Sequence, residues 1–353
     1  MPRTRSYPDR PASISVRYTH SRLSRWGFAP VVLEYLRIHR QYLDERAGLE
    51  RTFVIAELDL SARSTEGRKR QDATPGPNPK PKGRDCYQGA VAFASGLVVW
   101  QQLCRGNTAG HSLVGTALEA LRQRLPRLDL IRLDGGFLSA KVLNDLGEQR
   151  VPFLIKAGCK LASVRSLIDE TQPWRWQSYD EETRLRRCLR VRLLDDFCTP
   201  VTVILVECRR RVKRMKKGRR RWRPRVAPYA IVTDLHPWST ARISETSKKR
   251  RAIENFFKES GQSFRAGKRP SATSRGHPFF LSLLVRVSNL MQFFQRECLP
   301  KGYRVVSFTT VRRHFLEHAV EIDDRGERIV LIFNTSYPLQ RTANLMLRKA
   351  LAA

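Results

Sequence analysis

The sequence is poor in acidic residues and has no long apolar run. Asp and Glu number 33 against 66 Lys and Arg, giving a formal charge of +33 in 353 residues. So large an imbalance favours a polyanionic partner, and nucleic acid is the first candidate. No stretch approaches the roughly 18 to 20 uninterrupted apolar residues of a membrane span, and no apolar signal-peptide core follows the Arg-rich N-terminus. We therefore expect a cytoplasmic protein with no membrane partner.

Cysteine is scarce and scattered. The seven cysteines are odd in number and never stand in CxxC spacing. This pattern argues against a disulfide framework and against a structural zinc site. We expect reduced thiols that mostly fill the core.

Apolar periodicity predicts an α/β protein whose mixed sheet is flanked by helices. Strands are expected at 52–60, 128–133 and 151–155, with a hairpin over 89–103 turning at Ser95 and Gly96, and helices at 112–124 and 139–148. A β-rich segment without a convincing helix should follow, with strands at 190–194, 201–208 and 229–233. Helices should return at 247–259 and 279–294.

These elements suggest five regions. They are a basic arm with a helix near 28–38 (1–50), a first core part (51–159), a β-rich insertion (160–244), a second core part (245–295) and a mixed C-terminal segment (296–353). The Pro-punctuated stretch 64–84 is expected to be a long basic loop.

Three carboxylates carry the chemical signal. Asp59 and Asp134 lie near the ends of apolar strand-like runs, and Glu254 lies in a basic helical segment. Mg²⁺ prefers a few hard carboxylate oxygens, and paired Mg²⁺ ions stabilise the attacking and leaving oxygens of a phosphodiester. Taken singly, each acid has an ordinary structural explanation: a cap or turn for the aspartates, and an i,i+4 ion pair with Arg250 or Lys258 for Glu254.

Five short motifs in sequence order resemble the DDE transposases of bacterial insertion sequences, a cut-and-paste group with an RNase H-like core. They are ELDLS around Asp59, NPKPKGR at 78–84, RGNT at 105–108, LDGGF at 133–137 and IENFFKE at 253–259. The resemblance covers about residues 50–295. It implies an RNase H-like fold interrupted by a β-rich insertion domain.

The same resemblance implies a function. Asp59, Asp134 and Glu254 would be the catalytic residues and would hold Mg²⁺, for which Mn²⁺ could substitute; Gly135 and Gly136 would let the chain turn beside the metals. The partners would be double-stranded DNA, as transposon ends and target, and a second copy in a homodimer. The protein would then be associated with the nucleoid. An alignment placing Ser61 at the position of Asp59 is also open, and Glu57 is the reserve ligand on the same strand face.

The helix departs from the family pattern. Where the family has Tyr, Arg, Glu and Lys, this chain has Ser247, Arg250, Glu254 and Gly261. Contacts to DNA phosphate would then fall to Arg250 and to the neighbouring cations Lys248, Lys249, Arg251 and Lys258.

Other basic clusters are candidate DNA contacts. The run RRRVKRMKKGRRRWRPR at 209–225 could be a basic β-ribbon along a phosphate backbone, with Arg219, Arg220 and Arg221 as predicted contacts; a solvated loop is the alternative. The loop residues Lys80, Lys82 and Arg84 are added on the same grounds. Trp222 or Trp238 could stack on an extruded base, although core packing is the commoner role.

One motif is set aside. HFLEH at 314–318 fits the HxxEH zinc-peptidase pattern but lacks a suitable downstream acidic ligand, so a solvated helix face explains it better. Three function classes remain: a transposase, an inactive or domesticated DNA-binding derivative of one, and an RNA-binding or ribosome-associated protein. About fifty residues before the first strand are few for a separate end-binding domain, which suggests a truncated copy or an arm that takes over that role.

Overall fold

The computed structural model describes residues 13–17, 53–64, 72–77, 84–125, 127–159, 161–197, 199–216, 219–264, 276–317, 320–324, 328–333, 339, 341–342 and 345. The chain divides into two compact units. The first comprises residues 1–42, 259–266 and 286–353, and the second comprises residues 43–258 and 267–285. The predicted helix near 28–38 lies outside the described residues. No helix in the part of the chain that the structure describes is long and apolar enough to cross a membrane.

The second unit is built on one large mixed sheet. Its strands are β2 (Ile55–Ser64), β3 (Thr74–Pro75), β4 (Asp85–Ala94), β5 (Leu97–Arg105), β6 (Leu130–Leu133), β7 (Phe153–Gly158), β8 (Gln177–Ser178), β9 (Thr183–Val191), β10 (Val201–Lys216) and β11 (Arg219–Thr233). Their order is β3-β4-β2-β6-β7-β11-β10-β9-β8, with β5 beside β4. Neighbours β2, β6 and β7 run parallel and the other pairs run antiparallel. The predicted α/β fold, with a mixed sheet and flanking helices, is confirmed.

The β4–β5 hairpin forms as the sequence predicts. Ser95 and Gly96 both have positive φ, 50° and 80°. Tight hairpin turns require positive φ, which glycine adopts without steric cost. Consecutive positions of β4 from Cys86 to Ala94 are buried, as expected for a strand covered on both faces.

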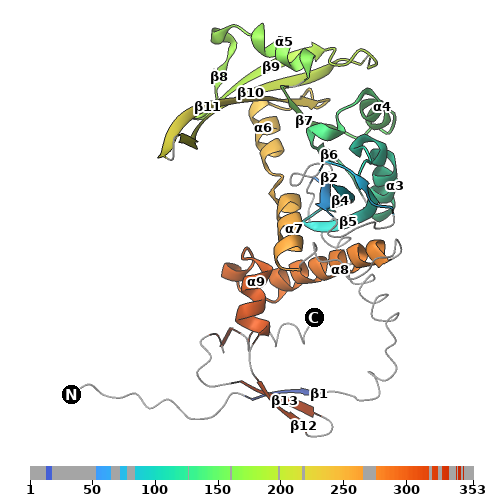
Figure 1. Ribbon diagram of the computed structural model, residues 1–353, viewed down its shortest axis with the longest axis vertical. Coiled ribbons are helices and arrows are strands. Elements are labelled where there is room, and N and C mark those ends of the chain that lie inside the picture. The colour runs from blue at the N-terminus through green and yellow to red at the C-terminus, as the bar shows by residue number, and fades with distance from the viewer. Residues whose placement is uncertain are drawn as a thin grey trace, which may run out of the picture. The chain divides into compact units, whose positions relative to one another are not determined.

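Helices cover both faces of this sheet (Figure 1). One face carries α3 (Val114–Arg124), α4 (Ala140–Glu148) and α5 (Ala162–Asp169), which share a core with Ile131 and Leu133 of β6. The opposite face carries α6 (Thr240–Lys248) and those parts of α7 (Arg251–Gln262) and α8 (Gly276–Glu297) that belong to the second unit. There, Leu130 of β6 shares a core with Ile243 of α6.

The segment 160–244 contains the strands β8, β9, β10 and β11. These strands continue the large sheet, because β11 pairs with β7. The strand expected at 190–194 is β9, which begins seven residues earlier at Thr183. Two helices were missed, α5 and α6. In α5 only Val164 is buried, and in α6 only Ile243 and Ser244, so neither helix shows a full apolar stripe.

The helix predicted over 247–259 is broken. Helix α6 ends at Lys248, and Lys249 has φ −81° and ψ 29°, outside the helical range. The chain resumes as α7 at Arg251. Arg250 therefore lies in a turn between two helices rather than on the same helix as Glu254.

The first unit contains a three-stranded antiparallel sheet in the order β1-β13-β12, formed by Ser13–Arg17, Arg328–Phe333 and Val320–Asp324. The N-terminal arm is thus not irregular throughout, because residues 13–17 pair with β13. Helix α9 (Phe308–Val311) lies in this unit and is followed by a π-helical turn over Arg312–Leu316. Its Phe308 N–H donates to Glu259 Oε2 at 3.3 Å.

Candidate active site

Asp59 and Asp134 lie side by side where the parallel pairing of β2 and β6 ends, although β2 continues beside β4 as far as Ser64. Strands β2 and β6 are parallel, and Leu58 is level with Leu133 in their register. The next residue in each strand direction is an aspartate, so the chain brings both carboxylates to one place. Figure 1 shows these two strands at the centre of the sheet, with α7 beside them. The expected juxtaposition of the two aspartates is present.

A glycine fixes the turn after Asp134. A Cβ on Gly135 would lie 2.6 Å from the carbonyl oxygen of Lys156 in β7, closer than a real Cβ approaches. Only glycine fits without moving backbone. Gly136 is different, because a Cβ there would meet no atom within 4 Å. Of the two glycines predicted to matter, the geometry requires Gly135.

One guanidinium joins the two aspartates. Arg250 Nη2 lies 3.4 Å from Asp59 Oδ2, and Arg250 Nη1 lies 3.7 Å from Asp134 Oδ1. Nη2 also donates to the backbone carbonyl of Leu58 at 3.5 Å. The Arg250 side chain is 14% exposed and that of Asp59 is 24% exposed, so solvent screens this pair only weakly. Asp134 is 57% exposed, so its pair with Arg250 is screened more strongly. These ion pairs replace the i,i+4 pair with Glu254 that the sequence left open.

Glu254 lies in the first turn of α7 and is exposed. Its charge reaches Asp59. Burial raises the pKa of the Asp59 carboxyl. The charge of Arg250 lowers this pKa, and so does the Leu60 N–H, which donates to Asp59 Oδ1 at 2.8 Å. The charges of Asp134 and Glu254 raise it. The net direction is upward. The charges of Asp134 and Glu254 therefore both act on Asp59.

A buried ion pair lies next to the site, two residues before Asp59 and Asp134 along the chain. Arg132 on β6 is level with Glu57 on β2, the guanidinium donates to the Glu57 carboxylate, and the two residues are 7% and 4% exposed. Arg132 Nη1 also donates to the carbonyl oxygen of Thr246 at 2.6 Å. Burial, with the nearby charge of Arg250, lowers the pKa of Arg132 to about 10. Glu57, the reserve metal ligand, is instead the partner of Arg132.

Sequence reasoning missed Arg132. The signal was present, because Glu57 and Arg132 each interrupt an apolar strand, and opposite charges in two such strands predict a cross-strand pair. No group of three or more His, Cys, Asp or Glu side chains is assembled as a metal site within the described ranges. Where Asp59 and Asp134 meet, the positive charge between the carboxylates is supplied by Arg250.

Comparison with known proteins assigns the sequence to a family. The sequence matches the family described as transposase DDE domain, group 1, over residues 19–352. The chain belongs to this family. No curated protein matches this sequence. Among solved structures, its fold is similar to that of the piggyBac transposase in a synaptic complex with hairpin DNA, determined by cryo-EM, at 12% identity and a TM-score of 0.46. The match covers 85% of this chain and 54% of that one, so the chain spans about half the length of that protein.

The remaining predicted cations of the transposase domain lie in several places. Lys258 is exposed one turn beyond Glu254 on α7. Lys248 lies 3.8 Å from Asp180 and over the ring of Tyr179, and Lys249 lies 3.0 Å from Glu245. Arg84 is exposed just before β4. Lys80 and Lys82 lie outside the described residues; for Arg251, Arg219, Arg220 and Arg221 the structure describes the backbone, in α7 and β11.

The structure describes the side chain of only one of the two candidate tryptophans, Trp238. Trp238 packs against Phe53 at 5.2 Å between ring centroids and beneath the guanidinium of Arg242 at 3.8 Å. These contacts support its core role. Trp222 is described only through its backbone in β11. In the set-aside HFLEH motif, His314 contacts Tyr303, and His318 lies outside the described residues.

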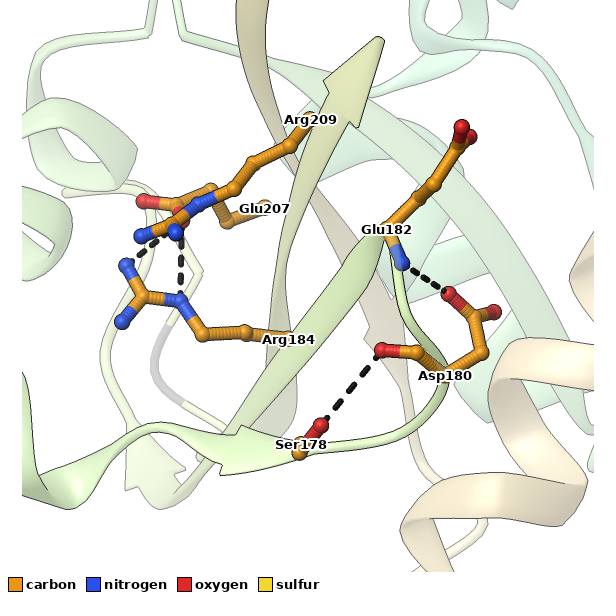
Figure 2. Close-up of polar contacts among 6 residues, drawn as sticks. All are labelled: Ser178, Asp180, Glu182, Arg184, Glu207 and Arg209. Carbon is orange, nitrogen blue, oxygen red and sulfur yellow. Dashed lines mark hydrogen bonds and ion pairs between the residues drawn. The ribbon is translucent and has the colours of Figure 1, made fainter.

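An acidic residue neutralises the base of the β10–β11 hairpin. Figure 2 shows Arg184 of β9 and Arg209 of β10 converging on Glu207. Arg184 Nη2 donates to Glu207 Oε1 at 2.6 Å, and Arg209 Nε donates to the same oxygen at 3.1 Å. In the transposase sequence Glu207 is the last acidic residue before Asp234. The hairpin beyond it is therefore entirely basic or neutral.

Proposed function

We propose that this transposase domain cleaves phosphodiester bonds at the ends of an insertion sequence and joins them to target DNA. Asp59, Asp134 and Glu254 are the proposed metal ligands and catalytic residues. The observation that carries the proposal is the meeting of Asp59 and Asp134 at one guanidinium, with Glu254 near enough to raise the pKa of Asp59.

The donor set fits a divalent cation. Three carboxylates with one arginine leave two negative charges, and carboxylate oxygens are the ligands that Mg²⁺ and Mn²⁺ prefer. When bound, such an ion stabilises the attacking and leaving oxygens of phosphodiester cleavage. Arg250 supplies positive charge at the same place, so guanidinium and metal are alternative counter-ions for Asp59 and Asp134. Once released, Arg250 is free to contact a DNA phosphate.

The partners follow from charge and family. A formal charge of +33 favours DNA, which the protein would bind as transposon ends and as target. We further propose that two copies act together on paired ends. A protein that binds DNA in this way would be located in the cytoplasm, in association with the nucleoid.

One observation favours a second candidate function. Arg250 already pairs with both aspartates, and no three-acid metal group is assembled among the described residues. A DNA-binding derivative that has lost catalysis would retain this arrangement. The two candidates differ in whether divalent cations change the behaviour of the site.

A cleavage assay separates them. Wild type and the Asp134→Asn variant are incubated with Mg²⁺ and supercoiled plasmid that carries the flanking ends of the element. The control is Asp169→Asn, the same chemical change at an exposed position of α5 on the opposite face of the sheet. Nicking by wild type and by the control, with loss in Asp134→Asn at unchanged DNA affinity, supports the transposase. Mg²⁺-dependent nicking by Asp134→Asn at the wild-type rate would rule out the assigned site, and no nicking by any protein would favour the inactive derivative.

A further inference from the structure

Strands β10 and β11 continue beyond the rest of the sheet as a two-stranded ribbon over residues 209–225. Strand β9 pairs with β10 only as far as Cys208, and β7 pairs with β11 only from Tyr229 onward. Pairing within the ribbon is unbroken from Arg209 opposite Val226 to Lys216 opposite Arg219. The register therefore assigns every ribbon residue to one of two faces.

The sheet core identifies these faces. Ile204, Val206 and Cys208 alternate along β10 and share a core with Ile243 of α6. Val203 and Leu205 share the opposite core with Val164 of α5. Because strand residues alternate between faces, even-numbered positions of β10 continue the α6 face and odd-numbered positions continue the α5 face. Figure 1 shows α5 and α6 on opposite sides of these strands.

The two ribbon faces differ in charge. Three cross-strand pairs on the α6 face place two cations directly opposite each other: Arg210 with Arg225, Arg214 with Arg221, and Lys216 with Arg219. The remaining pair of this face is Val212 with Arg223. Seven of its eight residues are thus basic. Like charges opposite one another destabilise a strand pair, so this face is poorly suited to exist without an anionic partner.

The α5 face of the ribbon is mixed. Its cross-strand pairs are Arg211 with Pro224, Lys213 with Trp222, and Met215 with Arg220, so each pair contains one cation and one uncharged residue. Glu207 lies on this same face and forms ion pairs with Arg184 and Arg209 at the base of the ribbon. The register also separates Arg220 from Arg219 and Arg221, which the sequence had grouped together.

The basic face of the ribbon and the proposed active site lie on the same side of the sheet. Leu130 shares the core of Ile243, and Arg132, two residues further along β6, donates to Thr246 of α6. Arg132 is level with Glu57, and Asp59 is two residues beyond Glu57 on β2. Alternation therefore gives Asp59 and the even-numbered ribbon positions one common sheet face. A long ligand can lie along that face and reach both.

We propose that the α6 face of the ribbon binds the phosphate backbone of duplex DNA and directs the duplex toward Asp59. This rests on the proposed function for the role of Asp59. The four basic rows extend about 20 Å at ~3.4 Å per residue, and the B-DNA major groove, about 12 Å wide, admits a two-stranded β-ribbon. The deep, narrow major groove of duplex RNA does not. Duplex DNA is thus the partner that this surface fits.

The test compares two variants that remove equal charge from the same part of the ribbon. Arg221→Ala/Arg223→Ala changes the α6 face, and Arg211→Ala/Lys213→Ala changes the α5 face. Affinity for a short DNA duplex is measured at several salt concentrations, with duplex RNA of the same sequence in parallel. The α6-face variant should weaken DNA binding and lower the slope of log affinity against log salt by up to about 1.8, because two phosphate contacts are lost. The α5-face variant should keep the wild-type slope.

Equal slopes for the two variants would overturn the proposal, as would RNA bound as tightly as DNA with the same dependence on face. Circular dichroism and thermal melting verify folding. If Arg221→Ala/Arg223→Ala does not fold, Arg214→Gln/Arg221→Gln tests the same face with side chains that remain long and polar. Failure of the ribbon proposal is distinct from failure of catalysis: a wild type that binds through this face without nicking DNA would leave the surface assigned and remove only the cleavage function.

Discussion

Arg132 and Glu57 form a buried ion pair across two parallel strands, and Arg132 extends it to the carbonyl of Thr246 near the end of α6. The pair thus links β2, β6 and the helix that ends just before Arg250. Because Asp59 and Asp134 follow on the same two strands, the distance from Arg250 to both aspartates depends on this link. We therefore expect the ion pair to help position Arg250 against the two aspartates.

Replacing Arg132 with Met should destabilise the fold strongly. The change leaves the carboxylate of Glu57 buried without its partner, and breaking a buried pair in this way costs about 3 to 5 kcal/mol. Urea unfolding measures the loss. The double variant Arg132→Met/Glu57→Leu should recover most of it, since no buried charge remains. A single-variant cost below about 1 kcal/mol would show that the pair contributes little.

Much of the fold was predictable from local pattern. The β4–β5 hairpin, the strands carrying Asp59 and Asp134, and helices α3, α4 and α8 all followed from apolar periodicity and turn residues. Helices α5 and α6 were missed because few of their side chains are buried. The break at Lys249 was missed because no Gly or Pro marks it. The joining of β11 to β7 depends on residues far apart in sequence, such as Tyr229 and Gly158, and local pattern does not encode it.

The candidate site was predictable in its acids but not in its counter-ions. The motifs that resemble the family pointed to Asp59 and Asp134, and the register of β2 and β6 places these two residues beside each other. The position of Arg250 depends on the helix break and on the Arg132 link to Thr246, both of which are tertiary features. Family membership meanwhile lends no support to the ribosome-associated alternative.

Gly135→Ala should be costly and Gly136→Ala should not. A methyl group on Gly135 would lie 2.6 Å from a backbone oxygen of β7, and forced overpacking costs about 1 to 3 kcal/mol. Gly136 has open space and serves as the matched control. Its change should stay within about 1 kcal/mol of wild type and could be stabilising, because alanine restricts the unfolded chain. Chemical denaturation measures the free energy of unfolding of both variants. Equal changes in that free energy would contradict the close approach at Gly135.

Asp59→Asn should stabilise the fold at neutral pH and make its stability less dependent on pH. The folded-state pKa of Asp59 is raised above the ordinary 3.8, first by burial, so the folded protein holds this proton more tightly than the unfolded chain does. The contribution of the protonated group is present below pH 3.8 and is lost as pH rises through the folded-state pKa. Thermal melting without divalent cations should therefore show a gain for Asp59→Asn at pH 7 that disappears in acid. A loss of Tm at pH 7 would mean that the ion pair with Arg250 outweighs burial.

Arg250→Gln should make the fold more dependent on divalent cations. Without the guanidinium, Asp59, Asp134 and Glu254 repel one another, and losing a largely buried ion-pair partner should cost about 1 to 3 kcal/mol in metal-free buffer. If metal and guanidinium are alternative counter-ions, Mg²⁺ or Mn²⁺ should raise the Tm of Arg250→Gln more than that of wild type. NaCl at matched ionic strength separates this effect from general screening.

Two controls complete the Arg250 experiment. Arg105→Gln removes an exposed ion pair with Asp72 at 3.2 Å and should leave the response to Mg²⁺ unchanged, because that pair lies in solvent. Adding Asp59→Asn and Asp134→Asn to Arg250→Gln should abolish the extra Mg²⁺ response, since the carboxylates that bind the ion are gone. An equal Mg²⁺ response in wild type and Arg250→Gln would show that the two aspartates do not exchange Arg250 for a metal, and Asp59 and Asp134 would then be a structural pair closed by arginine.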